Sequence, residues 1–545
     1  MPFLQTNSCS RERTFGRPRG ALELRAIATS MKPKGLSVQT TDELRPHGRV
    51  WLNWSLFFVA AYLIISLVGW RRTLIGTEIW ALYHAGQPLS EQLQAIRADL
   101  VHPPLMYLLE RLWFRAFGQS DGAAKALALL VNLPTFFLFT WLAHRITPHW
   151  RLASFLFLSV YLKIGSTPDL VRMYGLGLLL TVGAMVLWEK WNEKPSNGTL
   201  IAWSFVALLL IYTHLFGTLL LVSFAVTNWL CGPRRWAFTL AALIPAFAFL
   251  PWFLYVLPVY QSRGLADNVA WVPKQFSVSL GILAYGLLGE FPVRYLPAQV
   301  VIALLAGLLQ FVLLMLACRM AWRLWPPSSD LQPATRWFWA AGLLAYIPLA
   351  LIVFFSIGVT PALHWRFVLG ILPAYWLFVV LVCEASGRLA RALLLNVTLA
   401  WAVLNVGAAF ARMDIPSAPR QAAVLLAREQ QPSDVILCQN SCNEIYWELT
   451  HHFGRGGDVE FLAPQPVLDR LSVVRQADLD AIDSQTVGRI WLFADKGVQH
   501  DSFVRSIQQR GFALDKIISI RDNLLLLFTR PTAATLEQRP GVSRA

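Results

Sequence analysis

Long apolar stretches recur along most of this chain, and they restrict its fold more than any other feature. An α-helix needs about 20 mostly apolar residues to cross a bilayer. Of the 545 residues, 56% are hydrophobic and only 14% are charged, whereas soluble domains carry about 25% charged residues. Because a single soluble core cannot bury so much apolar surface, the sequence predicts a polytopic α-helical membrane protein and excludes soluble, fibrous and mostly disordered proteins.

We expect about eleven transmembrane helices between residues 50 and 411, preceded by a tail. The predicted spans are residues 50–70, 121–144, 150–165, 170–190, 199–214, 215–231, 236–258, 296–323, 337–358, 365–384 and 390–411. Residues 1–49 are polar and basic and lack the apolar core of a signal peptide, so we expect a disordered cytoplasmic tail there.

Basic residues predict the orientation of the spans. The loops at 145–151, 189–194, 232–235, 319–336 and 387–391 all carry Lys or Arg, and they fall on one side if the N-terminus is cytoplasmic. The positive-inside rule therefore predicts a cytoplasmic N-terminus and an extracytoplasmic C-terminal portion, although Arg71 and Arg72 oppose the trend. The net charge of +15 is spread over short loops without interleaved aromatic residues, which argues against nucleic-acid binding.

Three shorter apolar stretches, residues 77–86, 104–118 and 276–288, are predicted to be interfacial helices at the outer surface. The stretch 104–118 is amphipathic at helical spacing. One face carries Leu105, Leu108, Leu109, Leu112 and Trp113, and the opposite face carries Glu110, Arg111 and Arg115.

Beyond residue 413 the apolar runs shorten to strand length, which predicts a small extracytoplasmic α/β domain over 413–531 and a polar tail over 532–545. Expected strands are 435–438, 459–462, 490–493 and 524–528, and expected helices are 420–430, 443–453 and 501–511. The domain has no Gly-rich phosphate loop, so we do not expect it to bind nucleotides. Cys438 and Cys442 face an oxidising compartment in this topology, so a local disulfide and two free thiols are both open.

Ionisable residues avoid the middle of the predicted spans and gather at their outer ends. These residues are Glu78, His84, Asp99, His102, Asp169, Arg172, Tyr174, His214, His364 and Arg366. They are far apart in the sequence but share one predicted membrane face. The pattern indicates a reaction or binding site at the outer surface rather than an ion path through the bilayer.

Each of these signals also has a purely structural interpretation. Glu78 suits the first turn of a helix capped by Thr77, and it equally suits a general base. His102 precedes two prolines that can simply start a helix. Arg366 can be a residue that reaches for the interface, or it can bind phosphate in a bidentate manner.

The order of the motifs adds specificity. An acidic first loop with Glu78 is followed by HPPL at 102–105, RMYGL at 172–176, YTHLFG at 212–217 and WRFVLGILPA at 365–374. Over residues 50–411 the chain resembles the bacterial GT-C glycosyltransferases of the dolichyl-phosphate-mannose–protein mannosyltransferase-like superfamily, family 39. The resemblance implies a bacterial cytoplasmic-membrane enzyme that transfers a sugar, with inversion, from a polyprenyl-phosphate donor to an envelope glycan, lipid or protein acceptor outside.

The resemblance also implies roles for individual residues. The family's first outer loop holds an Asp-Glu pair, which here is Thr77 and Glu78, so Glu78 is the implied base. Other implied roles are Asp169 as the second catalytic carboxylate, Arg366, Arg172 and His214 at the donor phosphate, and His102, Asp99 and Tyr174 in positioning the loop or the acceptor. No metal-ligand set is predicted, and any need for a divalent metal or other cofactor stays open.

Two other functions compete with this prediction. A transporter or flippase for a lipid-linked saccharide would need inverted repeats or midplane charges, and neither is evident. A non-catalytic scaffold stays open because Thr77 replaces the family's Asp.

Overall fold

The computed structural model describes residues 48–263 and 333–412, with gaps at 69, 71–73, 75, 101, 166–170 and 359–363. It also describes parts of 308–319 and of 418–530. The predicted span 296–323, the predicted interfacial helix 276–288 and the predicted helix 443–453 lie largely or wholly outside the described residues.

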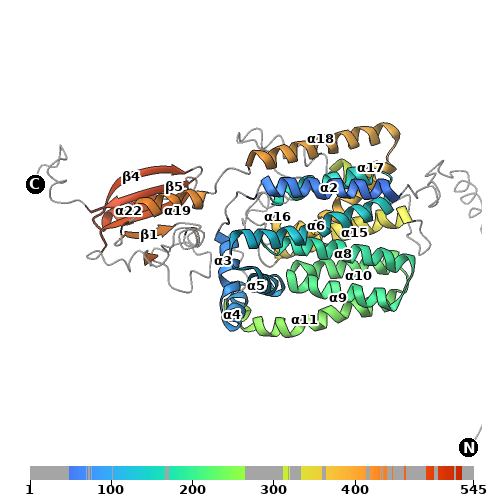
Figure 1. Ribbon diagram of the computed structural model, residues 1–545, viewed down its shortest axis with the longest axis horizontal. Helices are drawn as coiled ribbons and strands as arrows, with labels where there is room; N and C mark the ends of the chain where they lie inside the picture. Colours follow the sequence, from blue (N-terminus) through green and yellow to red (C-terminus); the bar gives the residue numbers. More distant parts are fainter. Residues whose placement is uncertain are drawn as a thin grey trace, which may run out of the picture. The chain divides into compact units, whose positions relative to one another are not determined.

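Long helices lie side by side in a bundle (Figure 1). They are α2 (Gly48–Val68), α6 (Asp121–Ile146), α7 (Trp150–Gly165), α8 (Tyr174–Glu193), α9 (Asn197–Thr213), α10 (Phe216–Cys231), α11 (Arg235–Arg263), α15 (Pro333–Gly358), α17 (Leu372–Ala385) and α18 (Arg388–Arg412). Except for α17, each begins and ends within a few residues of a predicted span. The span predicted at 365–384 is broken, because α16 (Trp365–Val368) and the 3-10 turn η2 (Leu369–Ile371) precede α17.

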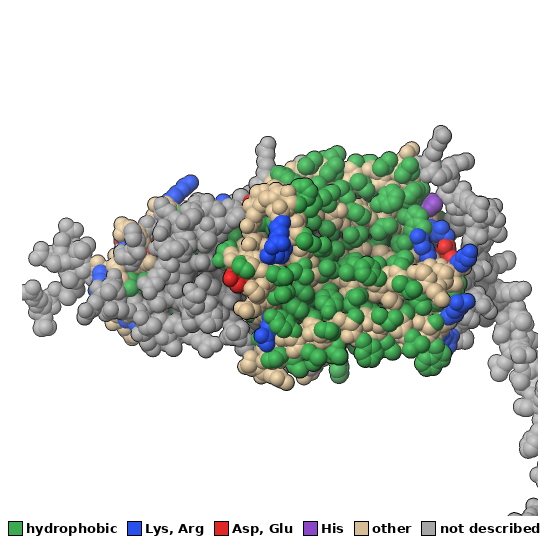
Figure 2. Space-filling view, turned by 60° about the horizontal axis from the view of Figure 1, so that its bottom comes forward, with side chains coloured by type: hydrophobic (Ala, Val, Ile, Leu, Met, Phe, Trp, Pro, Cys, Tyr) green, Lys and Arg blue, Asp and Glu red, His purple; other side chains and the backbone are tan. Residues whose placement is uncertain are grey.

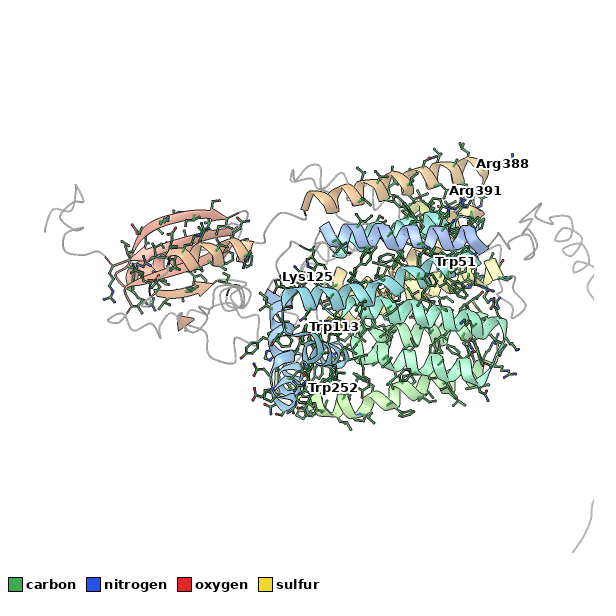
Figure 3. The ribbon with its side chains drawn as sticks, viewed as in Figure 1. Trp51, Trp113, Lys125, Trp252, Arg388 and Arg391 are labelled. Atoms are coloured by element: carbon green, nitrogen blue, oxygen red, sulfur yellow. The ribbon has the colours of Figure 1, made fainter. Side chains whose placement is uncertain are left out.

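The bundle carries the surface of a membrane domain. Among the described helices, α6, α11 and α15 are long and apolar enough to cross a membrane, judged by length and composition, and several others are apolar but shorter. Figure 2 shows a broad apolar surface over the helices with Lys and Arg at its two ends. Trp51 lies at one end of the bundle, and Trp113 and Trp252 lie at the other (Figure 3), as in the aromatic belts of membrane proteins. The count of eleven spans stays a prediction.

Three short helices lie crosswise at one end of the bundle (Figure 1). They are α3 (Gly76–Gly86), α4 (Leu89–Asp99) and α5 (Leu105–Phe117). Helices α3 and α5 match two predicted interfacial helices, but α3 begins at Gly76, so Thr77 is not its N-cap. Helix α4 is too polar to be found from hydrophobicity; the guanidinium of Arg97 stacks on the Tyr255 ring of α11 at 4.8 Å and holds it in place.

Helix α5 buries Glu110 and Arg111 of its predicted polar face, whereas Arg115 of that face is exposed, which differs from a helix lying alone at an interface. Its buried residues are Met106, Tyr107, Glu110, Arg111 and Phe114. Leu112, on the face rich in leucine, is 63% exposed. Arg111 donates to the backbone oxygens of Ala85 and Gln87 at the end of α3. In a membrane the outward face must be apolar, and polar side chains find their partners inside the protein.

The C-terminal part contains a five-stranded sheet in the order β2-β1-β3-β5-β4. Its elements are β1 (Asp434–Cys438), β2 (Glu460–Phe461), β3 (Arg489–Asp495), β4 (Ala513–Ile520), β5 (Asn523–Thr529), α19 (Ala418–Glu429) and α22 (Asp501–Gln509). β1 pairs in parallel with β2 and β3, whereas β5 pairs antiparallel with β3 and β4. Alternate residues of β3 pack on opposite faces: Trp491 lies in the cluster with α19, and Leu492 in the cluster with α22.

The sheet includes one strand, β4, that was not predicted. β4 is half-exposed and interrupted by charged residues, so it lacks the continuous apolar run of β5. At the start of β1, Asp434 accepts hydrogen bonds from Arg489 at 2.6 and 2.8 Å and from the Trp491 indole at 2.9 Å. Cys442 lies outside the described residues, so the predicted disulfide does too.

Candidate functional site at one end of the helical bundle

The predicted polar residues come together at the end of the bundle that carries α3, α4 and α5. The described members are Glu78, His84, Asp99, His102, Arg172, Tyr174, His214, His364 and Arg366. Asp169 lies outside the described residues, so its predicted pairing with Arg172 does too. The contacts below run from Glu78 on α3 to Arg366 on α16.

Glu78 joins α3 to the segment that precedes α8. It lies in the first turn of α3, as predicted, and its side chain is fully buried. The backbone N–H of Val171 donates to Glu78 Oε1 at 3.1 Å. This bond fixes the carboxylate beside Arg172, the residue that follows Val171 in the chain.

Arg172 lies between two aromatic rings. Its guanidinium carbon is 5.9 Å from the centre of the Trp80 ring of α3 and 5.8 Å from that of Tyr107 of α5. The side chain is buried. Cation–π contacts of this kind strengthen when water is excluded, so the rings hold a positive charge at this end of the bundle.

Asp99 and His102 form a hydrogen-bonded pair where α4 ends. His102 Nδ1 lies 2.7 Å from Asp99 Oδ2, and the Tyr107 hydroxyl donates to the same oxygen at 3.3 Å. Burial raises the pKa of Asp99, but the charge and hydrogen bond of His102, together with Arg172 and Tyr107, hold it below its ordinary value. The pair therefore contains an ionised carboxylate that orients an imidazole.

A strained residue reverses the chain between these two side chains. Leu100 has φ 60°, in the left-handed region that residues other than glycine rarely adopt. The Tyr260 hydroxyl of α11 donates to its backbone oxygen. Strain of this kind costs about 1–3 kcal/mol and persists only where the surroundings enforce it.

His214, between α9 and α10, lies against His102 and Tyr174. The ring centres are 5.3 Å apart for the two histidines and 5.8 Å apart for His214 and Tyr174. Burial, and then the nearby His102, lower the pKa of His214 well below its ordinary value. Its Nδ1 accepts from the Phe216 N–H at 3.0 Å, so the neutral ring carries its proton on Nε2. His214 is thus a hydrogen-bond donor and not a cation.

Arg366 reaches the same place from α16. His364 is the N-cap of α16, and its Nδ1 accepts from the Arg366 backbone N–H at 3.3 Å. Burial, with the charge of Arg366, lowers the pKa of His364 to about 3, so this ring is neutral. Arg366, His214 and Tyr174 line a cavity of about 20 Å³. That volume holds about one water molecule, so a sugar or phosphate can enter only if the walls move apart.

A larger cavity of about 260 Å³ lies between α3 and α4. Its lining residues are Tyr83, His84, Gln87, Glu91, Gln94 and Ala95. Burial lowers the pKa of His84 to about 4, against the opposite effect of Asp99. The lining therefore offers a phenol, amides, a neutral imidazole and the carboxyl group of Glu91, all of which hydrogen-bond to hydroxyls. Among the described residues no group of three His, Cys, Asp or Glu is arranged to hold a metal ion.

Sequence reasoning missed the contribution of α5. Tyr107 and Glu110 lie on its buried face, and both belong to this cluster. The sequence did contain a signal: Pro104, Tyr107 and Glu110 are three residues apart, so on a helix they share one face. It was hidden because Glu110 and Arg111 look like the water-facing side of an amphipathic helix.

Among solved structures, the chain is similar to ArnT from Cupriavidus metallidurans. The TM-score is 0.48, with 15% identity, for ArnT bound to undecaprenyl phosphate, and 0.47, with 14% identity, for the apo state. Both alignments cover 87% of this chain and 98% of ArnT. The arabinofuranosyltransferase AftD from Mycobacteria is similar at a TM-score of 0.41 and 13% identity, over 88% of this chain and 40% of AftD. No family model matches the sequence, and no curated protein matches it.

Proposed function

We propose that this chain is an inverting glycosyltransferase that moves a sugar from a polyprenyl-phosphate donor to an acceptor at the outer face of the bacterial cytoplasmic membrane. The observation that carries the proposal is the meeting of several carboxyl groups, Glu78 among them, with two guanidinium groups and neutral imidazoles at one end of an apolar bundle. The order of HPPL, RMYGL, YTHLFG and WRFVLGILPA along the chain supports it.

On the donor side, the leaving group is a polyprenyl phosphate, whose negative charge grows as the glycosidic bond breaks. Arg366 and Arg172 supply positive charge at this end of the bundle, and His214 offers an N–H donor beside Arg366. Guanidinium groups pair with phosphate oxygens in a bidentate manner. Stabilising charge that develops in the transition state is commonly the largest catalytic effect. In this proposal Arg366, Arg172 and His214 stabilise the leaving phosphate.

On the acceptor side, Glu78 takes the proton of the attacking hydroxyl. The oxygen–carbon bond to the acceptor forms as the bond between the anomeric carbon and the phosphate oxygen breaks, so the configuration inverts. A positioned base contributes on the order of 10²–10⁴ in rate. Asp169 is the second carboxylate assigned to this step, and Asp99 and His102 hold the loop in place. The cavity between α3 and α4 offers the acceptor hydrogen-bonding groups.

Transport of a lipid-linked saccharide explains the site less well. A transporter places its polar residues near the bilayer midplane and reaches them from both sides. Here the polar cluster belongs to the end with the crosswise helices. A scaffold without activity would need neither the buried Glu78 nor the buried Arg172 and the half-buried Arg366 in the same cluster.

The test is donor turnover by the purified protein in lipid nanodiscs. Synthetic undecaprenyl-phosphate monosaccharides serve as donors, envelope lipid and glycan extracts serve as acceptors, and release of undecaprenyl phosphate is measured. We expect Glu78→Gln to lower turnover by at least about 100-fold, whereas Glu193→Gln, at the end of α8 opposite Tyr174, turns over as the wild type does. No release from any donor by the wild type, or full activity of Glu78→Gln, would contradict the proposal.

A further inference from the structure

Glu110 on α5 is a titratable side chain of the cluster to which the proposed mechanism gives no role. Its side chain is 0% exposed. Neither Oε1 nor Oε2 has a hydrogen-bond partner among the described residues. A carboxylate in this condition loses its hydration without replacement, which costs several kcal/mol, and such groups usually keep their proton instead.

The surroundings of Glu110 add to this effect. Burial is the largest influence, Arg172 opposes it, and the charge of Glu78 adds to it; together they raise the pKa of Glu110 to about 8. Other titratable groups lie on α5 and on the elements packed against it: Tyr83 and His84 on α3, Tyr107, Arg111 and Arg115 on α5, Asp121, Lys125, His144 and Arg145 on α6, and Tyr212 on α9, with Asp99 of α4 bonded to Tyr107. Two of them are engaged elsewhere: Lys125 donates to the Trp70 oxygen at 2.7 Å, and Arg111 donates to the end of α3.

Helix α5 presents two side chains to the same guanidinium. Tyr107, three residues before Glu110, places its ring 5.8 Å from Arg172, and Glu110 interacts with Arg172 through its charge state. If Glu110 ionised, it would be a third carboxylate near Arg172, after Glu78 and the ionised Asp99, and it would add negative charge where an anionic donor has to bind. If it stays neutral, no such charge is added.

We propose that Glu110 is a positioning residue that stays protonated at neutral pH and so preserves the positive charge of Arg172 for an anionic donor. The proposal rests on the proposed function, in which Arg172 contacts the donor phosphate. In this role Glu110 takes no part in proton transfer or in bond breaking. Its consequence is a loss of donor affinity in alkaline solution, when Glu110 loses its proton.

The first test is the dependence of KM for the donor on pH. In the wild type we expect KM to rise in alkaline solution by up to about tenfold per pH unit, because a single proton is lost. We expect kcat to change little. Glu110→Gln, a neutral mimic, keeps its neutral-pH KM within about twofold and lacks the alkaline rise. Glu193→Gln keeps the wild-type profile. An unchanged rise in Glu110→Gln, or a large loss of affinity in that variant at neutral pH, overturns the proposal.

The second test does not depend on turnover. Infrared difference spectra of wild type and Glu110→Gln at neutral pH detect the C=O stretch of a protonated carboxyl directly. We expect this band in the wild type and its loss in the variant, with thermal unfolding showing that both are folded. A spectrum with only ionised carboxylate at Glu110 refutes the proposal. Inactivity towards every donor, with the protonated band present, instead refutes the proposed function.

Discussion

At this site, the hydrogen-bonding role of a side chain depends on its partners more than on its residue type. His102, His214 and His364 share one residue type, but each has a different environment. His102 bonds to an ionised Asp99, His214 is buried against two rings, and His364 caps α16. Two of them are neutral donors, so positive charge for a phosphate has to come from arginine.

The pairing of Asp99 makes stability depend on pH. Because its folded-state pKa lies below the ordinary value, the ionised carboxylate stabilises the fold above about pH 4, and this contribution is lost as the pH falls through the lower folded-state value. We expect Asp99→Asn to lower stability at neutral pH by about 1–3 kcal/mol, and the difference to shrink in acid. Thermal unfolding in detergent across the acidic range measures it.

The matched control is Glu91→Gln, an exposed carboxyl on the same helix. It should leave the unfolding temperature unchanged at every pH. If the Asn variant were as stable as the wild type at neutral pH, the Asp99–His102 bond would not contribute to the stability of the fold.

Close packing between helices positions His214. The motif YTHLFG ends in Gly217, whose N–H donates to the His214 oxygen at 2.8 Å in the turn from α9 to α10. A Cβ at this position would lie 2.7 Å from the Leu210 backbone oxygen of α9. Since backbone atoms cannot move aside cheaply, only glycine fits this turn.

We therefore expect Gly217→Ala to reduce stability by about 1–3 kcal/mol and to lower donor turnover, because the turn that carries His214 must shift. The control is Gly198→Ala, in the first turn of α9, where a Cβ would meet nothing within 4 Å. That variant should be neutral or slightly more stable. Equal stability of both variants in thermal unfolding would argue against the close contact.

Helix boundaries and the meeting of the polar residues could be predicted from the sequence, because apolar length and outer-end position are both local signals. The face of α5 could not, because the usual rule that polar residues face water reverses for a helix packed between protein and lipid. Helix α4 and strand β4 were missed because their apolar residues are interrupted. Glu110 followed from neither pattern; only its burial singles it out.

For the protein as a whole, both ends of the bundle carry titratable side chains; the end opposite α3, α4 and α5 holds Glu189, Glu384 and His144. The end with α3, α4 and α5 gathers carboxylates, histidines and buried arginines. Arg388 and Arg391 lie at the opposite end, with Trp51 (Figure 3). Basic residues alone would also attract a lipid phosphate there. The location of a bound phosphate therefore distinguishes a specific binding site from a merely basic surface.

The most direct test is a cryo-electron microscopy structure of the protein in nanodiscs with undecaprenyl phosphate. We predict density for the phosphate group at the α3–α5 end, within hydrogen-bonding distance of Arg366 or Arg172, and the lipid chain along the apolar surface of the bundle. A phosphate bound only beside Arg388 and Arg391, or separate positions for Glu78 and Arg366 at opposite ends of the bundle, would contradict the account.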